Sequence, residues 1–210
     1  MKTMQLPLIF IISLFPTLLL AMPDYFVDSE WLADNIEERN VMVMEVRYHP
    51  HRYFTVGHIP GAIQVQRFKD LGDNDASPLM RFPSRETFQQ RLRNWGVNDD
   101  TTLVLYDDSN TALLSRLYFL LELYGFNMQQ VKVLSGGTTE WSAFEDMENT
   151  APESREAGNV TLKDGNKNLY VDWTNVYDDV VSRRDPGIVL LDARPTDMYT
   201  GAVIRHSIMA

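Results

Sequence analysis

The hydrophobic pattern of the chain alternates between short apolar runs and longer amphipathic stretches. Short apolar runs bounded by polar residues or glycine occupy 41–46, 62–65, 103–106 and 131–134. Such runs are typical of strands covered on both faces. Stretches with apolar residues at helical spacing occupy 30–38, 84–95, 112–124 and 138–144. The alternation predicts an α/β fold, with a parallel sheet flanked by helices on both faces.

The centre of this pattern is the apolar strand 103–106, the polar loop 107–111 and the apolar helix 112–124, which Gly125 ends. A strand that feeds a helix through such a loop aims backbone N–H groups and the positive end of the helix at one point, an anion site. Here Asp107 holds that point. The carboxylate either caps the helix or acts as an aspartyl nucleophile, and the lack of a P-loop or metal triad favours capping.

The chain divides into four segments. Residues 1–21, with Lys2, an apolar run from Leu6 to Leu20 and the small Ala21, indicate a signal peptide, with an uncleaved anchor as the alternative. Residues 22–147 form a first domain, and the segment 148–168, rich in Glu, Asn, Pro, Gly and Lys, is expected to be a linker. The signal predicts a periplasmic or secreted protein.

The opening pattern returns after the linker. Phe26-Val27-Asp28 is answered by Tyr170-Val171-Asp172, and Val46-Arg47 by Ala193-Arg194. This weak repeat predicts an incomplete second copy of the domain over 169–210, which ends after its second strand. Such a remnant cannot bury a core alone, and the chain is therefore expected to be a fragment of a longer protein.

Composition narrows the chemistry. The net charge of −10 argues against nucleic acid and against anionic membrane surfaces, so no membrane contact is expected beyond the signal segment. The chain has no cysteine, which excludes a disulfide, a Cys-ligated zinc site and a thiol nucleophile within it. Its four histidines lack metal-motif spacing, so no metal is expected, and nothing suggests a cofactor.

The motifs resemble those of the rhodanese, or sulfurtransferase, family. The stretches that carry the resemblance are Glu45-Val46-Arg47, Tyr53, Gly57-His58-Ile59-Pro60-Gly61-Ala62, the strand 103–106, Arg116, Leu134-Ser135-Gly136-Gly137 and Trp141. His58, Pro60, Gly61, Arg116, Gly136, Gly137 and Trp141 are interpreted as structural motif residues.

The resemblance implies a rhodanese-like sheet and a tandem thiosulfate or 3-mercaptopyruvate sulfurtransferase, whose second domain carries a cysteine that forms a persulfide. Asp107 stands at the matching position of the first domain and cannot form one. The expected partners are small sulfur-containing anions and an intramolecular second rhodanese domain. Arg47 and Arg194 are candidate substrate-binding residues, unless they pair locally and order their loops. The alternative function is a non-catalytic binding or regulatory module.

Overall fold

The computed structural model describes residues 24–73, 75–76, 81–109, 111–151 and 154–201. The chain divides into two compact units, one up to Asp164 and one from Gly165 onward. The predicted signal segment, 1–21, lies outside the described residues. Within the described ranges, no helix combines the length and the apolar character needed to cross a lipid bilayer.

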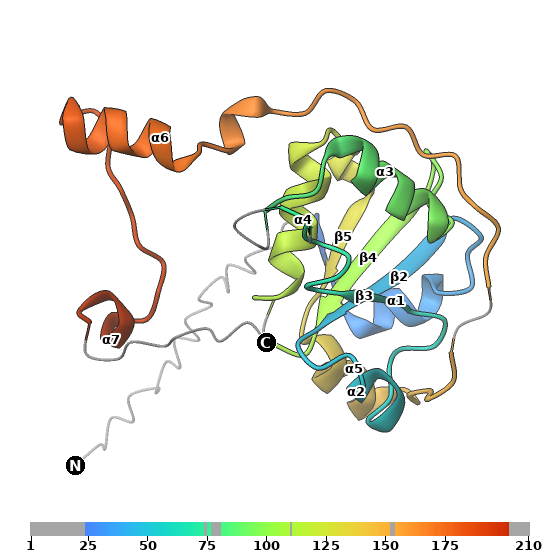
Figure 1. The fold of residues 1–210 in the computed structure, drawn as a ribbon. Helices are drawn as coiled ribbons and strands as arrows, with labels where there is room; N and C mark the ends of the chain where they lie inside the picture. Colours follow the sequence, from blue (N-terminus) through green and yellow to red (C-terminus); the bar gives the residue numbers. More distant parts are fainter. Residues whose placement is uncertain (1–23, 74, 77–80, 110, 152–153, 202–210) are drawn as a thin grey trace, which may run out of the picture. The chain divides into compact units, whose positions relative to one another are not determined.

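The first unit is built on a five-stranded parallel sheet. Its strands are β1 (Phe26–Val27), β2 (Val41–Arg47), β3 (Ile63–Gln66), β4 (Thr102–Asp107) and β5 (Val131–Leu134). The order is β1-β5-β4-β2-β3, and every pairing is parallel (Figure 1). The four apolar runs of the sequence are therefore strands, as predicted. β1 was not predicted.

Helices cover both faces of this sheet, which confirms the predicted fold class. They are α1 (Ser29–Asn35), the short α2 (Arg52–Thr55), α3 (Arg85–Asn94), α4 (Leu114–Leu123), the 3-10 turn η1 (Met128–Gln130) and α5 (Gly137–Phe144). One core cluster joins the sheet to α3 and α4, through side chains such as Phe88 and Leu117. A second cluster joins the other face to α1 and α5, through Leu32 and Trp141.

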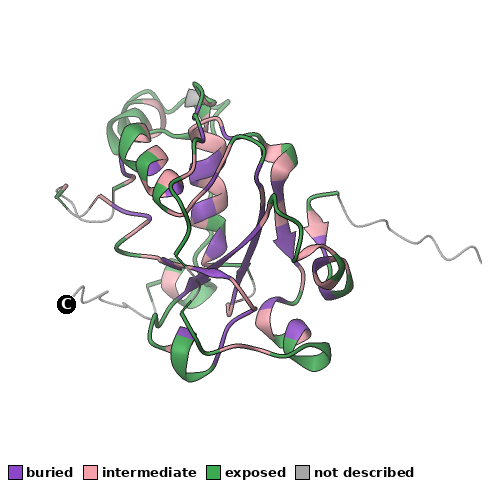
Figure 2. Cartoon of the chain, turned by 90° about the vertical axis from the view of Figure 1, so that its right-hand side faces the viewer, coloured by how far each residue is buried: buried purple, intermediate pink, exposed green. Residues whose placement is uncertain are grey.

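The strands explain why both faces are apolar. In β2, Met42, Met44 and Val46 point toward α3 and α4, whereas Val43 lies in the cluster under α1 and α5. Figure 2 shows that buried residues concentrate in the strands and on the inner sides of the helices. Because side chains alternate along a strand, Glu45 shares the face of Val43, so a carboxylate stands inside an otherwise apolar layer.

Residues 154–164, which we call the strap, follow the first unit closely. Val160 and Leu162 are buried in the cluster under α3 and α4. The backbone N–H of Val160 donates to the carbonyl oxygen of Val97 at 3.1 Å, and the N–H of Gly158 to the carbonyl oxygen of Arg93 at 2.8 Å. Much of the segment predicted as a linker is thus attached to the first domain through apolar side chains and backbone hydrogen bonds.

In its described part, the second unit contains short helices and no strand. They are η2 (Lys167–Leu169), α6 (Trp173–Val176), the π-helical η3 (Tyr177–Ser182) and α7 (Thr196–Tyr199). The side chain of Asp172 caps α6, as that of Asp28 caps α1, and the predicted repeat stays a prediction. The expected second strand is wrong for the described residues, because 188–191 is irregular chain. A strand with no neighbour has no ladder of hydrogen bonds to stabilise it.

Candidate functional site

The candidate site lies at the carboxyl edge of the sheet, where β2 and β4 end. Val46 of β2 is in register with Asp107 of β4, so the residues that follow the two strands start side by side. In open α/β sheets this edge is where ligands bind. The loop from Asp107 then leads into α4, which begins at Leu114.

The carboxylate of Asp107 is surrounded by backbone donors. Its Oδ1 accepts hydrogen bonds from the N–H groups of Ser109 and Thr111, both at 2.9 Å. Its Oδ2 accepts from the N–H groups of Leu113 at 2.7 Å and Leu114 at 3.0 Å. The side chain is only 4% exposed. Four N–H groups and the positive end of α4 therefore form an anion cradle, and the chain's own carboxylate fills it.

A small cavity of about 70 Å³ adjoins this cradle, between the Asp107 loop and the turn Gly136–Gly137. Gly137 has φ of 52°, and a Cβ atom there would lie 2.5 Å from the carbonyl oxygen of Asp107. Only glycine tolerates both that backbone conformation and that approach. The Gly-Gly turn is therefore what allows α5 to begin next to the cradle.

A buried polar cluster stands directly behind the cradle. Arg47 Nε lies 2.7 Å from Glu45 Oε1 as a close ion pair, and Arg47 Nη2 donates to Glu45 Oε2 and to the carbonyl oxygen of Gly57, both at 2.9 Å. The hydroxyl of Tyr106 donates to Glu45 Oε2 at 2.5 Å and accepts from the N–H of Ile59 at 3.0 Å.

The environment shifts the protonation of this cluster. Burial raises the pKa of Glu45 to about 7, against the lowering effects of the Tyr106 hydrogen bond and the Arg47 charge. Burial also raises the pKa of Tyr106, and the nearby Glu45 charge adds to the rise. Glu45 thus lies at the end of β2 as a buried carboxyl group that titrates near neutrality, in contact with the guanidinium of Arg47.

Arg47 thus pairs with acidic side chains of the protein itself. It is 2% exposed, and its nearest acidic neighbour after Glu45 is Asp108, 3.9 Å from Nε. Asp108 in turn pairs with Arg52 of α2 at 3.0 Å. These contacts order the loop after β2 against the loop after β4. Substrate binding by Arg47 stays a prediction.

The Gly57–Ala62 turn is locked by hydrogen bonds around His58. Its Nδ1 lies 2.9 Å from the carbonyl oxygen of Tyr53, and its Nε2 lies 3.1 Å from Glu148 Oε1. The ring stacks on that of Tyr53 with the centroids 3.5 Å apart. Glu148 also accepts from the N–H of Gly61 at 2.7 Å, next to Pro60 in the turn. The imidazole is fully buried, as suits a residue that holds a turn.

The remaining motif residues hold other parts of the frame. Arg116 donates to the carbonyl oxygen of Leu71 at 2.8 Å, and its guanidinium lies 4.5 Å from the centroid of the Phe82 ring. Trp141 is buried, and its indole N–H donates to the carbonyl oxygen of Asp146 at 3.1 Å. Gly136, with φ of 69°, precedes α5. These contacts tie Leu71 and Phe82 to α4 and hold the two ends of α5.

Arg194 belongs to the second unit, where its side chain is exposed and pairs with Asp192 at 2.5 Å. Within the described part of the chain, no three His, Asp or Glu side chains gather closely enough to hold a metal ion. Sequence reasoning missed Glu148 and the hydroxyl of Tyr106 as parts of the site. Glu45 gave the one signal that pointed there, since it interrupts an apolar strand.

Comparison with known proteins agrees with this geometry. Residues 28–144 match the model of the Rhodanese-like domain. The 3-mercaptopyruvate sulfurtransferase of Escherichia coli K12 is 26% identical over 190 residues, which cover 85% of this chain and 64% of that protein. The sulfur carrier protein TtuD of Thermus thermophilus is 28% identical over 182 residues, 86% of this chain and 61% of that one.

Among solved structures, SseA from Escherichia coli, described as a 3-mercaptopyruvate sulfotransferase with the rhodanese fold, superposes with a TM-score of 0.73 at 25% identity. The match covers 85% of this chain and 69% of that one. The chain spans about three-fifths of the length of the two curated relatives named above. The sheet, the filled cradle and the matching family model lead to one conclusion: the chain belongs to the family of rhodanese-like domain proteins.

Proposed function

We propose that this chain is the N-terminal, non-catalytic part of an exported rhodanese-family sulfurtransferase. The whole protein would move sulfane sulfur from thiosulfate or 3-mercaptopyruvate to a thiophile through a persulfide. The names of the relatives support this class of reaction. The chain itself contains no cysteine, so the sulfur-carrying thiolate has to come from residues outside it.

The observation that carries the proposal is the carboxylate of Asp107 in the cradle. In a catalytic rhodanese domain, loop N–H groups of this kind would stabilise a thiolate or persulfide. Here the four N–H groups are already satisfied, and a fixed negative charge would repel an anionic sulfur donor. The first domain is therefore a scaffold, which would pack against a catalytic domain and help to wall its site.

The second unit supports the need for more chain. Trp173, Val189 and Leu191 are 77%, 77% and 84% exposed. Apolar side chains gathered in so short a segment are typical of a surface that another part of a protein covers. In our proposal, the intramolecular second rhodanese domain supplies that cover.

Export is the part of the proposal that rests on the N-terminus alone. Lys2, the apolar run up to Leu20 and the small Ala21 fit a cleavable signal. Cell fractionation followed by N-terminal sequencing tests it. A mature protein in the periplasm or medium that starts at Met22 supports export, and a cytoplasmic protein that keeps Met1 contradicts it.

The reaction is tested on the natural gene product. Its intact mass should exceed that of the 210-residue chain, and it should contain a cysteine. It should form thiocyanate from thiosulfate or 3-mercaptopyruvate with cyanide, and a Cys→Ser variant should not. Thiocyanate formation by the purified 210-residue chain would refute the proposal. A natural product without cysteine would instead favour a non-catalytic binding module, which the self-filled cradle also fits.

A further inference from the structure

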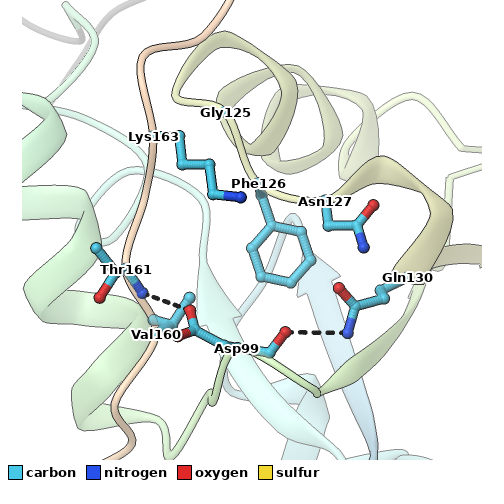
Figure 3. Close-up of a pocket in the computed structure, with 8 residues that line it drawn as sticks. All are labelled: Asp99, Gly125, Phe126, Asn127, Gln130, Val160, Thr161 and Lys163. Atoms are coloured by element: carbon cyan, nitrogen blue, oxygen red, sulfur yellow. Dashed lines mark hydrogen bonds between the residues drawn. The ribbon is translucent and has the colours of Figure 1, made fainter.

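A larger cavity, of about 490 Å³, lies in the first unit near the amino ends of β4 and β5 (Figure 3). Its walls come from three segments: Asp99 before β4, the corner 125–130 between α4 and β5, and the strap. Since all strands are parallel, it lies at the sheet edge opposite the Asp107 cradle. The volume falls within the range of small-molecule pockets, ~300–1,000 Å³.

The strap holds Lys163 in place at the rim. On one side, Leu162 is 5% exposed and its N–H donates to Gln89 Oε1 at 2.8 Å. On the other side, Asp164 pairs with Arg85 at 2.7 Å. The ammonium group of Lys163 itself has no hydrogen bond or ion pair with any residue that the structure describes. Figure 3 shows its side chain reaching from the strap toward Phe126.

A second donor faces the same cavity. The side-chain oxygen of Asn127 accepts from the N–H of Gln129 at 3.2 Å, which leaves the amide NH₂ as a donor. Gln130 uses its own NH₂ group on the carbonyl oxygen of Asp99, at 3.1 Å. Among the side chains that line this cavity, the ammonium of Lys163 and the amide of Asn127 thus keep donors for a ligand.

The cavity also has an apolar wall, and its surroundings limit the negative charge that a ligand can carry. Phe126, which is 7% exposed, presents its ring between these donors. The carboxylate of Asp99 lines the same cavity, and α4 ends just before Gly125, which lines the cavity too, with the negative end of its dipole. One ammonium group can offset a single negative charge here, but a second negative charge would meet two repulsive neighbours.

We propose that this cavity binds a small organic monocarboxylate with an apolar, planar body. The carboxylate pairs with Lys163 Nζ, the body contacts the ring of Phe126, and the Asn127 amide lines the same cavity. The site is separate from the Asp107 cradle and does not depend on the function proposed above. It lies on the strap, so it also gives the attached segment 154–164 a role beyond linking two units.

The test uses the 210-residue chain and phenylacetate, followed by calorimetry and by NMR shifts of backbone amides. We expect a dissociation constant of about 1 mM, with shifts at Phe126 and Thr161. Lys163→Gln should weaken binding by about tenfold or more, whereas Lys163→Arg should stay within about threefold of the parent. Lys69→Gln, on the exposed loop after β3, removes the same charge elsewhere and should leave the affinity unchanged.

Two further probes check the chemistry. Phenyl phosphate should bind at least about tenfold more weakly than phenylacetate because of its second charge, and 2-phenylethylamine should bind more weakly still. The proposal is overturned if phenylacetate at about 10 mM shifts no residue of the cavity, or if Lys163→Gln and Lys69→Gln bind it equally. Tighter binding of the phosphate or the amine than of phenylacetate overturns it as well.

Discussion

Replacing Asp107 with alanine tests whether its carboxylate holds the loop before α4. The change removes the acceptor of four backbone N–H groups. Thr111 is exposed, and Ser109 and Leu113 are half-buried, so water can replace part of their bonds, but Leu114 is buried. Each buried N–H left without a partner costs about 1–3 kcal/mol. We therefore expect a loss of about 3–4 kcal/mol in the free energy of unfolding.

Urea unfolding, followed by circular dichroism, measures this loss. Asp107→Asn keeps one carbonyl oxygen and should lose about 2 kcal/mol, since one pair of donors keeps its acceptor. Asp34→Ala, at an exposed position of α1, is the matched control and should change stability by less than about 0.5 kcal/mol. A loss below about 1 kcal/mol for Asp107→Ala would refute the view that these bonds organise the loop.

Adding an anion tests whether the loop before α4 binds anions or whether Asp107 contributes packing alone. In Asp107→Gly the four N–H groups are vacant, so sulfate should bind there and restore stability. At ten times its dissociation constant, the gain is about 1.4 kcal/mol beyond the general effect of sulfate on the parent protein. If sulfate stabilises the variant and the parent by equal amounts, the loop is not an anion cradle.

Three further predictions concern other parts of the fold. The pKa of Glu45 is raised from 4.5 to about 7 in the folded state. Its protonated form therefore stabilises the fold fully below about pH 4.5, and about 3 kcal/mol of the free energy of unfolding is lost as the pH rises through about 7. Denaturation at several pH values should show this pH dependence in the parent and not in Glu45→Gln. Leu162→Ala should cost about 2–5 kcal/mol and expose the strap to proteases, whereas Leu191→Ala, at an exposed position, should cost under about 0.5. Gly137→Ala should lower the thermal midpoint much more than Gly61→Ala, because both residues have positive φ but only Gly137 has a backbone oxygen where the Cβ would go; equal shifts would contradict the steric argument.

The long, strongly patterned elements could be predicted from the sequence. α3 begins after Ser84, whose hydroxyl accepts from the N–H of Thr87 at 3.1 Å, and α4 ends before Gly125, as expected from their capping residues. The central strands could be predicted because both of their faces are buried, so their apolar runs are nearly continuous, with Glu45 as the interruption in β2. Burial on one side only would have left a weaker pattern.

The elements that were missed are short or polar. β1 has two residues and α2 has four, too few to show a period. The composition of the strap predicts a linker because most of its residues are polar, whereas the buried side chains of Val160 and Leu162 and several backbone hydrogen bonds attach it to the core. The average composition of a segment does not reveal that two of its side chains, Val160 and Leu162, are buried in the core.

In the site too, features set by sequence neighbours could be predicted, whereas contacts between residues far apart in the sequence could not. The position of Asp107 at a helix start could be predicted from its neighbours in the sequence. The cluster of Glu45 with Tyr106 could not, because the two residues are 61 positions apart and meet only through the pairing of β2 with β4. His58 can be assigned to a turn from its neighbours in the sequence, but its partner Glu148 lies 90 positions away.

The pairing of β1 with β5 has a consequence for how the chain is made. Phe26 is one of the first described residues to leave the ribosome, yet its partner in the sheet is Val133, roughly a hundred residues later. At ~5–20 residues per second, β1 waits ~5–20 s for its neighbour. During that time α5 has not been made either, so it does not yet cover the apolar faces of β2, β3 and β4. The nascent first unit therefore stays a substrate for chaperones until its last strand emerges.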